Sequence, residues 1–162
     1  MATTLNASME FPAPAATVFA MFSDPTYLEL KCAQSEQGNF EVSNSDSRRS
    51  ICIKRSFDEV PDSYRKFLGS DLIIKEEQIW NFSVNQIFQA DWKIVLEGKP
   101  VLLVGTLKLE DTSGGSMLIL DTEVTVGIPF FSAMAESFIR EHFSKVLDDE
   151  RAIGLHWLEK HK

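Results

Sequence analysis

The stretch FFSAMAESFIREHFSKVLDDERAIGLHWLEK, from Phe130 to Lys160, decides the fold. At 3.6 residues per turn its apolar side chains fall on one broad stripe, which predicts an amphipathic helix. The stripe consists of Phe131, Ala135, Phe138, Ile139, Val146, Ile153 and Trp157. Pro129 suits the first turn, where its missing N–H costs nothing. One straight helix would span about 45 Å; a shorter helix bent at Gly154 is equally compatible with the pattern.

The chain before this helix predicts the sheet on which the helix lies. Residues 3–11 alternate strictly between apolar and polar side chains, as a half-buried strand does. Apolar rows beginning at Phe88, Val101 and Leu118 each occupy one face of a strand, with Trp92 facing inward. Glycine-containing turns join these strands and predict an antiparallel meander. Because each strand has one apolar face, the terminal helix is expected to cover one face of the sheet.

The remaining elements are shorter. Residues 15–23 and 25–33 predict two short helices after the first strand, and the second begins at an Asp-Pro pair typical of a helix start. Residues 38–43, 49–57 and 71–80 predict three more strands. The chain has no internal repeat and no linker, so residues 1–162 are expected to form a single domain.

Composition limits the function. The chain has 162 residues with 44% hydrophobic and 25% charged residues, which are values of a globular domain. A net charge of −8 opposes binding to nucleic acid and to anionic membranes. No apolar run reaches 18 residues and no signal peptide is evident, so we expect a cytoplasmic protein without integral membrane association. Cys32 and Cys52 are expected to be reduced and unpaired.

Two local motifs carry a resemblance to a known superfamily. The residues FPAP at 11–14, VF at 18–19 and DPTYL at 24–28 resemble its proline-led first helix and the Asp-containing break after it. The residues VGIPFFSAMAE at 126–136 resemble the entry to the last helix in an uncharacterised bacterial branch. With the element order, these motifs resemble the START-like (SRPBCC) superfamily, which holds lipid-transfer domains, polyketide cyclases and the birch-pollen allergen family. The branch usually has two small residues, often glycines, where Ser132 and Ala133 stand.

The resemblance implies an α+β helix-grip fold, in which a curved antiparallel sheet of about seven strands wraps around the long C-terminal helix. It also implies an apolar cavity between the two, because a curved sheet does not lie flush on a straight helix. The expected floor is Trp92, Leu103 and Leu120, and the expected roof is Phe131, Met134, Phe138 and Ile139.

Three polar residues are candidates for the cavity wall. Arg55 shares an inward strand face with isoleucines, where a guanidinium is costly unless it is paired or reaches solvent. One interpretation is that Arg55 anchors an acidic head group of a ligand. The interpretation that we favour is that Arg55 pairs with Glu76 or Glu77, or extends to the rim of the cavity. The strand pattern does not decide which of these two glutamates faces inward; Glu77 is retained as a candidate.

Two polar residues interrupt the helix stripe, His142 and Asp149. His142 is a candidate donor to a ligand oxygen or a general base, although a histidine satisfied on the helix flank is the favoured explanation. Asp149 is expected near the end of the cavity or in solvent.

The sequence contains no nucleophile constellation, no P-loop and no GxGxxG motif, and its histidines and cysteines lack metal-ligand spacing. We therefore assign no catalytic residue, no metal and no cofactor. The leading hypothesis is binding or transport of a small hydrophobic molecule such as a lipid, isoprenoid or polyketide. The alternatives are a cyclase/aromatase-like enzyme using His142 and Arg55, and a protein-interaction module that uses the outer sheet face. The sequence leaves open whether the protein forms a weak homodimer.

Overall fold

The computed structural model describes residues 2–58, 60–82, 87–127, 130 and 132–161. The strands are β1 (Ala2–Phe11), β2 (Gly38–Asn44), β3 (Arg48–Phe57), β4 (Leu72–Phe82), β5 (Phe88–Leu96), β6 (Val101–Thr112) and β7 (Gly115–Val126). The helices are α1 (Ala15–Phe22), α2 (Pro25–Cys32), α3 (Arg65–Leu68) and α4 (Ser132–Lys160), with a 3-10 turn η1 (Asp62–Tyr64) before α3.

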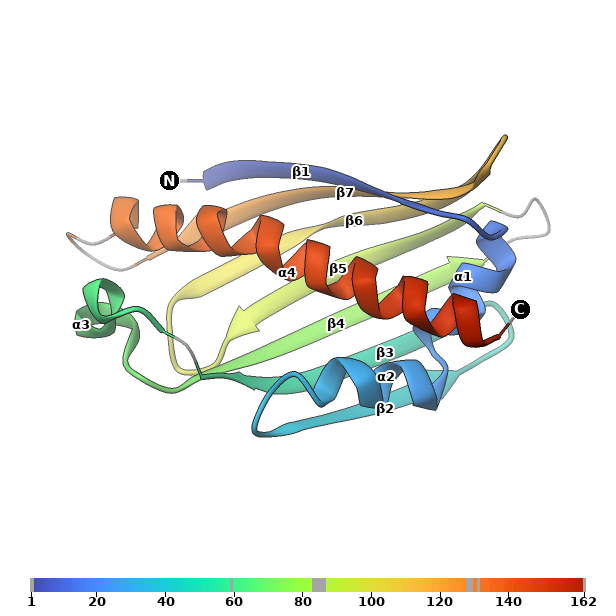
Figure 1. Cartoon of the computed structure of the whole chain (residues 1–162). Helices are drawn as coiled ribbons and strands as arrows, with labels where there is room; N and C mark the ends of the chain where they lie inside the picture. Colours follow the sequence, from blue (N-terminus) through green and yellow to red (C-terminus); the bar gives the residue numbers. More distant parts are fainter. Residues whose placement is uncertain (1, 59, 83–86, 128–129, 131, 162) are drawn as a thin grey trace.

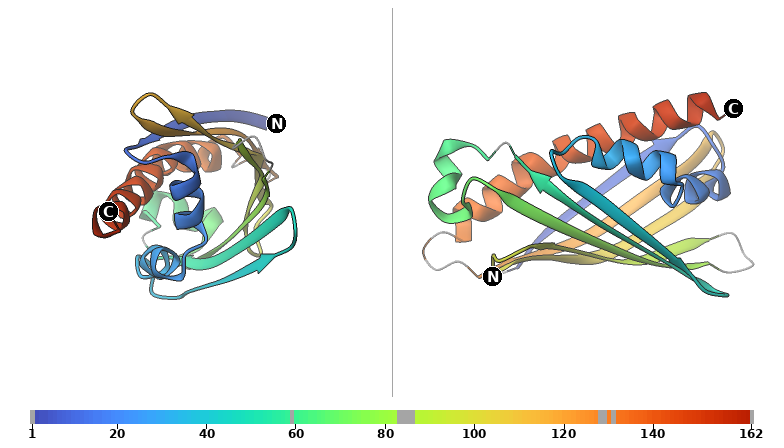
Figure 2. Two further views of the ribbon diagram at one scale, coloured as in Figure 1. Left: turned by 90° about the vertical axis from the view of Figure 1, so that its right-hand side faces the viewer. Right: turned by 90° about the horizontal axis from the view of Figure 1, so that it is seen from below.

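All seven strands form one antiparallel sheet in the order β1-β7-β6-β5-β4-β3-β2. The sheet curves strongly, and α4 runs along its concave face while α1 and α2 close one end (Figures 1 and 2). The predicted fold class, a curved antiparallel sheet around a long C-terminal helix with two short helices after the first strand, is confirmed.

The predicted register of the central strands is also confirmed. Ala90 and Trp92 are buried under α4, whereas Gln89 and Asp91 are exposed on the convex face. Trp92 lies opposite Gln78 on β4 and opposite Gly105 on β6. Because side chains alternate along a strand, this register fixes which residues of the neighbouring strands reach the interior.

Helix α4 is a single helix of 29 residues, so the bent alternative at Gly154 is not adopted. Gly154 instead marks a point of close packing, since a Cβ there would lie 3.0 Å from Phe11 and 3.1 Å from Met21. The buried face of α4 also differs from the predicted stripe. Leu147 and Leu158 are buried, while the expected Ile139, Val146 and Ile153 are half-buried.

The interior contains two apolar clusters that meet beneath the middle of α4. The first lies between α1, α2 and the C-terminal half of α4, and includes Trp92 and Leu147. The second lies under the N-terminal half of α4, next to η1 and α3, and includes Leu103 and Phe138. Ile94 contacts both clusters. The position of a residue along α4 therefore determines which of the two it can reach.

Gly105 allows β6 and β7 to approach closely. A Cβ at this position would overlap the main-chain oxygen of Asp121 and would lie 2.8 Å from the Cα of Thr122. We expect Gly105→Ala to lower the free energy of unfolding by about 3 kcal/mol, because rigid backbone must move. Urea denaturation measures this change. Gly114→Ala is the control, since nothing lies within 4 Å of a Cβ there; equal stabilities of the two variants would contradict the argument.

Candidate functional site

A buried carboxylate lies at the centre of the site. The even-numbered side chains of β4 face inward, so Glu76 is only 4% exposed and Glu77 lies on the convex face. Trp92 Nε1 and Gln78 Nε2 donate to Glu76 Oε2 at 2.8 and 2.7 Å. Trp80 Nε1 donates to Gln78 Oε1 at 2.8 Å. Two indoles and an amide thus hold one oxygen of the carboxylate in place.

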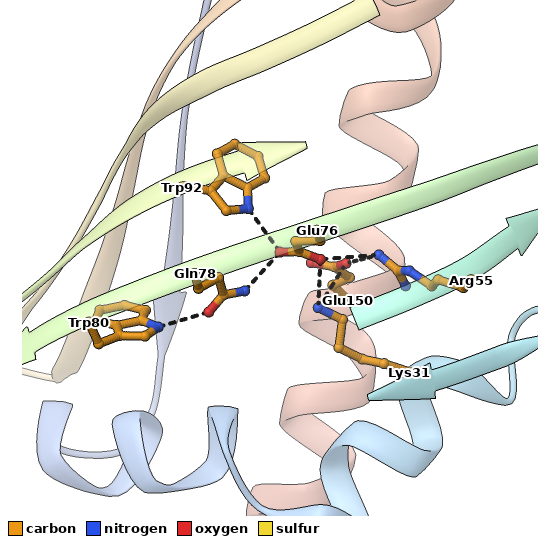
Figure 3. Close-up of polar contacts among 7 residues, drawn as sticks. All are labelled: Lys31, Arg55, Glu76, Gln78, Trp80, Trp92 and Glu150. Atoms are coloured by element: carbon orange, nitrogen blue, oxygen red, sulfur yellow. Dashed lines mark hydrogen bonds and ion pairs between the residues drawn. The ribbon is translucent and has the colours of Figure 1, made fainter. Parts of the chain in front are cut away.

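Three more charged side chains surround Glu76, each from a different element (Figure 3). Arg55 Nη2 on β3 donates to Glu150 Oε1 on α4 at 2.8 Å and lies 3.6 Å from Glu76 Oε1. Lys31 Nζ on α2 lies 3.2 Å from Glu150 Oε1 and 3.5 Å from Glu76 Oε1. We call Lys31, Arg55, Glu76 and Glu150 the ion cluster. It joins α2, two strands and α4.

Local sequence explains how α2 delivers Lys31. Asp24 caps the helix by accepting from the backbone N–H of Thr26 at 2.9 Å, and Pro25 occupies the first turn. Trp157 Nε1 on α4 donates to Asp24 Oδ1 at 3.3 Å, which ties the end of α4 to the start of α2. Lys31 then points into the interior, where it is 2% exposed.

The ion cluster holds Lys31, Arg55 and Glu76 in their charged forms. Burial by itself raises the pKa of Glu76, but Lys31, Arg55 and the hydrogen bonds from Gln78 and Trp92 outweigh burial and lower that pKa from 4.5 to about 2. Burial by itself lowers the pKa of Lys31 and that of Arg55, but the carboxylates of Glu150 and Glu76 outweigh it and raise both pKa values. Each charge is therefore stabilised by its neighbours.

This electrostatic arrangement is unfavourable for acid–base chemistry. A general acid or base works best with a pKa near the operating pH. Glu76, with a pKa of about 2, is a weak base, and Lys31 stays protonated, so its amine lacks a free electron pair. Burial also raises the pKa of Tyr27, which lies beside the cluster. The groups are suited to orienting a molecule rather than to exchanging protons with it.

A cavity of about 30 Å³ lies between the ion cluster and strands β1, β6 and β7. Its polar wall is formed by Tyr27, Lys31, Glu76, Gln78 and Glu150, together with the indole of Trp92. Its apolar wall is formed by Met9, Phe11, Phe22, Leu107, Leu118, Leu120 and Leu147. The cavity thus lies in the first apolar cluster, under the C-terminal half of α4.

The structure brings only some of the predicted site residues to this cavity. Trp92 and Leu120 line it, and Arg55 belongs to the ion cluster beside it. Leu103, Phe138 and Ile139 pack instead in the second apolar cluster, toward the other end of α4. The cavity of the structure is therefore displaced along α4 from the one that the sequence predicted.

The other predicted site residues that the structure describes are not among those that line the cavity. Met134 is 44% exposed, and Glu77 faces outward because Glu76 takes the inward position. His142 Nδ1 lies 2.9 Å from the carbonyl oxygen of Phe138, and its ring contacts that of Phe138. His142 is thus held on the helix flank, as the favoured explanation had it. Phe131 lies outside the described residues.

Asp149 is exposed and lies 4.0 Å from Lys145.

Among the members of the ion cluster, sequence reasoning missed Lys31 and Glu150. Both had a signal, because each shares a helix face with apolar residues: Lys31 follows Tyr27 by one turn, and Glu150 follows Leu147 by nearly one turn. A charged residue on the buried face of each of two helices indicates a pair of opposite charges in the interior.

Neither a metal site nor a membrane span is found in the described part of the chain. No group of three or more His, Cys, Asp or Glu residues there is placed to hold a metal ion. No helix among those residues is long and apolar enough to cross a membrane.

The chain has the START-like helix-grip fold, with a small, partly polar cavity under the last helix. Residues 6–158 match the family described as "Protein of unknown function (DUF2505)", and the chain belongs to that family. A search of curated proteins gives no match.

Solved structures share the fold at low sequence identity. An uncharacterized protein from Rhizobium leguminosarum is 15% identical with a TM-score of 0.63, covering 96% of this chain and 95% of that one. The Zhui aromatase/cyclase from Streptomyces sp. R1128 is 8% identical with a TM-score of 0.61, covering 95% and 94%. A norcoclaurine synthase from Thalictrum flavum is 16% identical with a TM-score of 0.60, covering 100% and 98%.

The lowered pKa of Glu76 predicts acid sensitivity. Because that pKa is lower in the folded than in the unfolded protein, the stabilisation is complete above about pH 4.5 and is lost as the pH falls toward about 2. We expect this group to contribute on the order of 3 kcal/mol to the free energy of unfolding across that window. Denaturant unfolding at a series of pH values should show this loss in the parent and in Glu77→Gln. If the free energy of unfolding of Glu76→Gln fell equally steeply with falling pH, the effect could not be assigned to Glu76.

Proposed function

We propose that the protein binds a small, mainly apolar molecule between the sheet and α4 and does not catalyse a reaction. The observation that carries this proposal is the cavity itself, which is mainly apolar on the side of β1, β6 and β7 and faces a neutral set of buried charges on the side of β4 and α2. Apolar walls with a few placed polar groups are typical of small-molecule sites. The shared fold with an aromatase/cyclase supports the binding of a small molecule, at the level of the fold, and not the absence of catalysis.

The size of the cavity implies that binding includes a local rearrangement. About 30 Å³ has room for two or so water molecules, whereas drug-sized ligands occupy about 300–1,000 Å³. Two lining side chains are well suited to move. Met9 is unbranched and flexible, and Leu147 lies on α4 at the edge of the cavity. We infer that these side chains turn aside when the ligand enters.

The enzymatic alternative has less support from the geometry. His142 does not line the cavity, and Arg55 is engaged by Glu150. The two residues therefore do not converge on one reacting position, as catalysis requires. A non-catalytic binding role agrees better with Glu76, Lys31 and Arg55 of the ion cluster, because the pKa of each is moved away from neutrality.

A protein-interaction role would need an exposed apolar surface. Among the described residues, the large apolar side chains with the greatest exposure are Ile87, Val104, Phe130 and Met134. Of these only Val104 lies on the convex face of the sheet, where it is 47% exposed. The convex face therefore gives little support to this role. The cytoplasmic location and the weak homodimer stay predictions.

Native mass spectrometry of the purified protein tests the proposal directly. We expect a fraction of the protein to carry a co-purified small-molecule mass, which is lost on denaturation. Titration with the neutral fluorescent probe N-phenylnaphthylamine gives an independent measure. Absence of both a co-purified mass and probe binding would contradict a binding function.

Enlarging the cavity should strengthen probe binding. Leu147→Ala removes a lining side chain, so we expect a lower free energy of unfolding, by about 2–3 kcal/mol, together with tighter binding of the probe. Leu103→Ala is the matched control, because it creates a similar void in the second cluster, away from the cavity. It should destabilise without improving probe affinity. Equal affinities in the two variants would place the ligand elsewhere.

A further inference from the structure

We propose that the ligand carries an uncharged hydrogen-bond donor, such as an alcoholic or phenolic hydroxyl, that donates to Glu76 Oε1. This inference rests on the proposed binding function and deepens it by naming the chemical class of the ligand. It excludes carboxylates such as free fatty acids, and also amines that are charged at neutral pH.

The two oxygens of Glu76 have different environments. Oε2 accepts hydrogen bonds from Gln78 and Trp92. Oε1 is buried and accepts no hydrogen bond from the part of the chain that the structure describes. Its nearest cations, at 3.5 and 3.6 Å, contribute charge but lie beyond a good N–H···O distance. An ionised carboxylate oxygen accepts more than one hydrogen bond, so Oε1 has acceptor capacity left.

Glu76, which carries this unpaired oxygen, is also one of the residues that line the cavity. The other buried side-chain oxygens without a hydrogen bond in the described residues belong to Ser116, Thr122 and Glu136. None of these three residues lines the cavity, whereas Glu76 does. The amide of Gln78 is engaged on both sides, by Trp80 and by Glu76. A donor that enters the cavity therefore finds its unused partner at Glu76.

The charges around the cavity are already balanced. Lys31 on α2 and Arg55 on β3 provide two positive charges, and Glu76 on β4 and Glu150 on α4 provide two negative charges. A carboxylate ligand would add a third negative charge next to Glu76, and an ammonium ligand a third positive charge next to Lys31. Either addition leaves a buried charge uncompensated, which is costly. A neutral hydroxyl makes the hydrogen bond without disturbing the balance.

Four probes with the same ring system separate these cases: naphthol, naphthalene, naphthoate and naphthylmethylammonium. At pH 7 the first two are neutral and the last two are charged. Titration of the unmodified protein should give naphthol the highest affinity, by on the order of tenfold over each of the others. If naphthoate, the ammonium or naphthalene binds as tightly as naphthol, the inference fails while the binding function stands. If none of the four binds and native mass spectrometry shows no co-purified mass, the binding function itself fails.

A pair of variants locates the donor's partner. Glu76→Gln removes one negative charge from the cluster, so the ratio of naphthol to naphthoate affinity should fall to about one or below. Glu77→Gln makes the same change on the convex face and should leave the ratio at about tenfold. An unchanged ratio in a folded Glu76→Gln protein would overturn the inference. If that variant does not fold, the four-probe comparison on the unmodified protein still decides.

Discussion

The burial of one negative charge on the concave face of the sheet is the constraint on which this structure depends. Glu76 is nearly inaccessible to solvent. The free-energy cost of burying an isolated carboxylate there would exceed the whole free energy of unfolding of a typical domain. The buried carboxylate is tolerated because Gln78, Trp92 and two cations converge on it. One cation comes from α2 and the other from β3, and Glu150 of α4 balances them. The position of both helices against the sheet thus follows from the neutralisation of one carboxylate.

Such a cluster contributes specificity more than stability. Buried ion pairs often add little net free energy, since desolvation offsets their attraction, but the loss of one member is strongly destabilising. Close packing at Gly154 and the hydrogen bond from Trp157 to Asp24 already constrain α4 near its C-terminal end. The contact between Glu150 and both Lys31 and Arg55 adds a constraint one to two turns earlier in the helix. Together these contacts fix the C-terminal half of α4 over the first apolar cluster.

The sequence was sufficient to predict the helices and strands, but not how these elements are placed against one another. Strict alternation around Trp92 determined its strand register, and the apolar stripe identified α4, because both patterns are local. On β4 the block from Lys75 to Gln78 is polar on both faces, so no local pattern could choose between Glu76 and its neighbour. Arg55 and its partner Glu150 lie 95 residues apart, and only the tertiary fold brings them together.

The same limit explains why the predicted cavity was displaced. Periodicity states which face of α4 is buried but not which turn lies over which strand. The sequence placed the cavity near Phe138 and His142, whereas the structure places it near Leu147, about 13 Å further along the helix axis. The ion cluster also restricts how this cavity can open. Lifting α4 at Glu150 would separate it from Lys31 and Arg55 and leave buried charges unpaired. Side-chain movement on the apolar side avoids that cost, so the cavity can enlarge there while the charged wall, with its free acceptor, keeps its place.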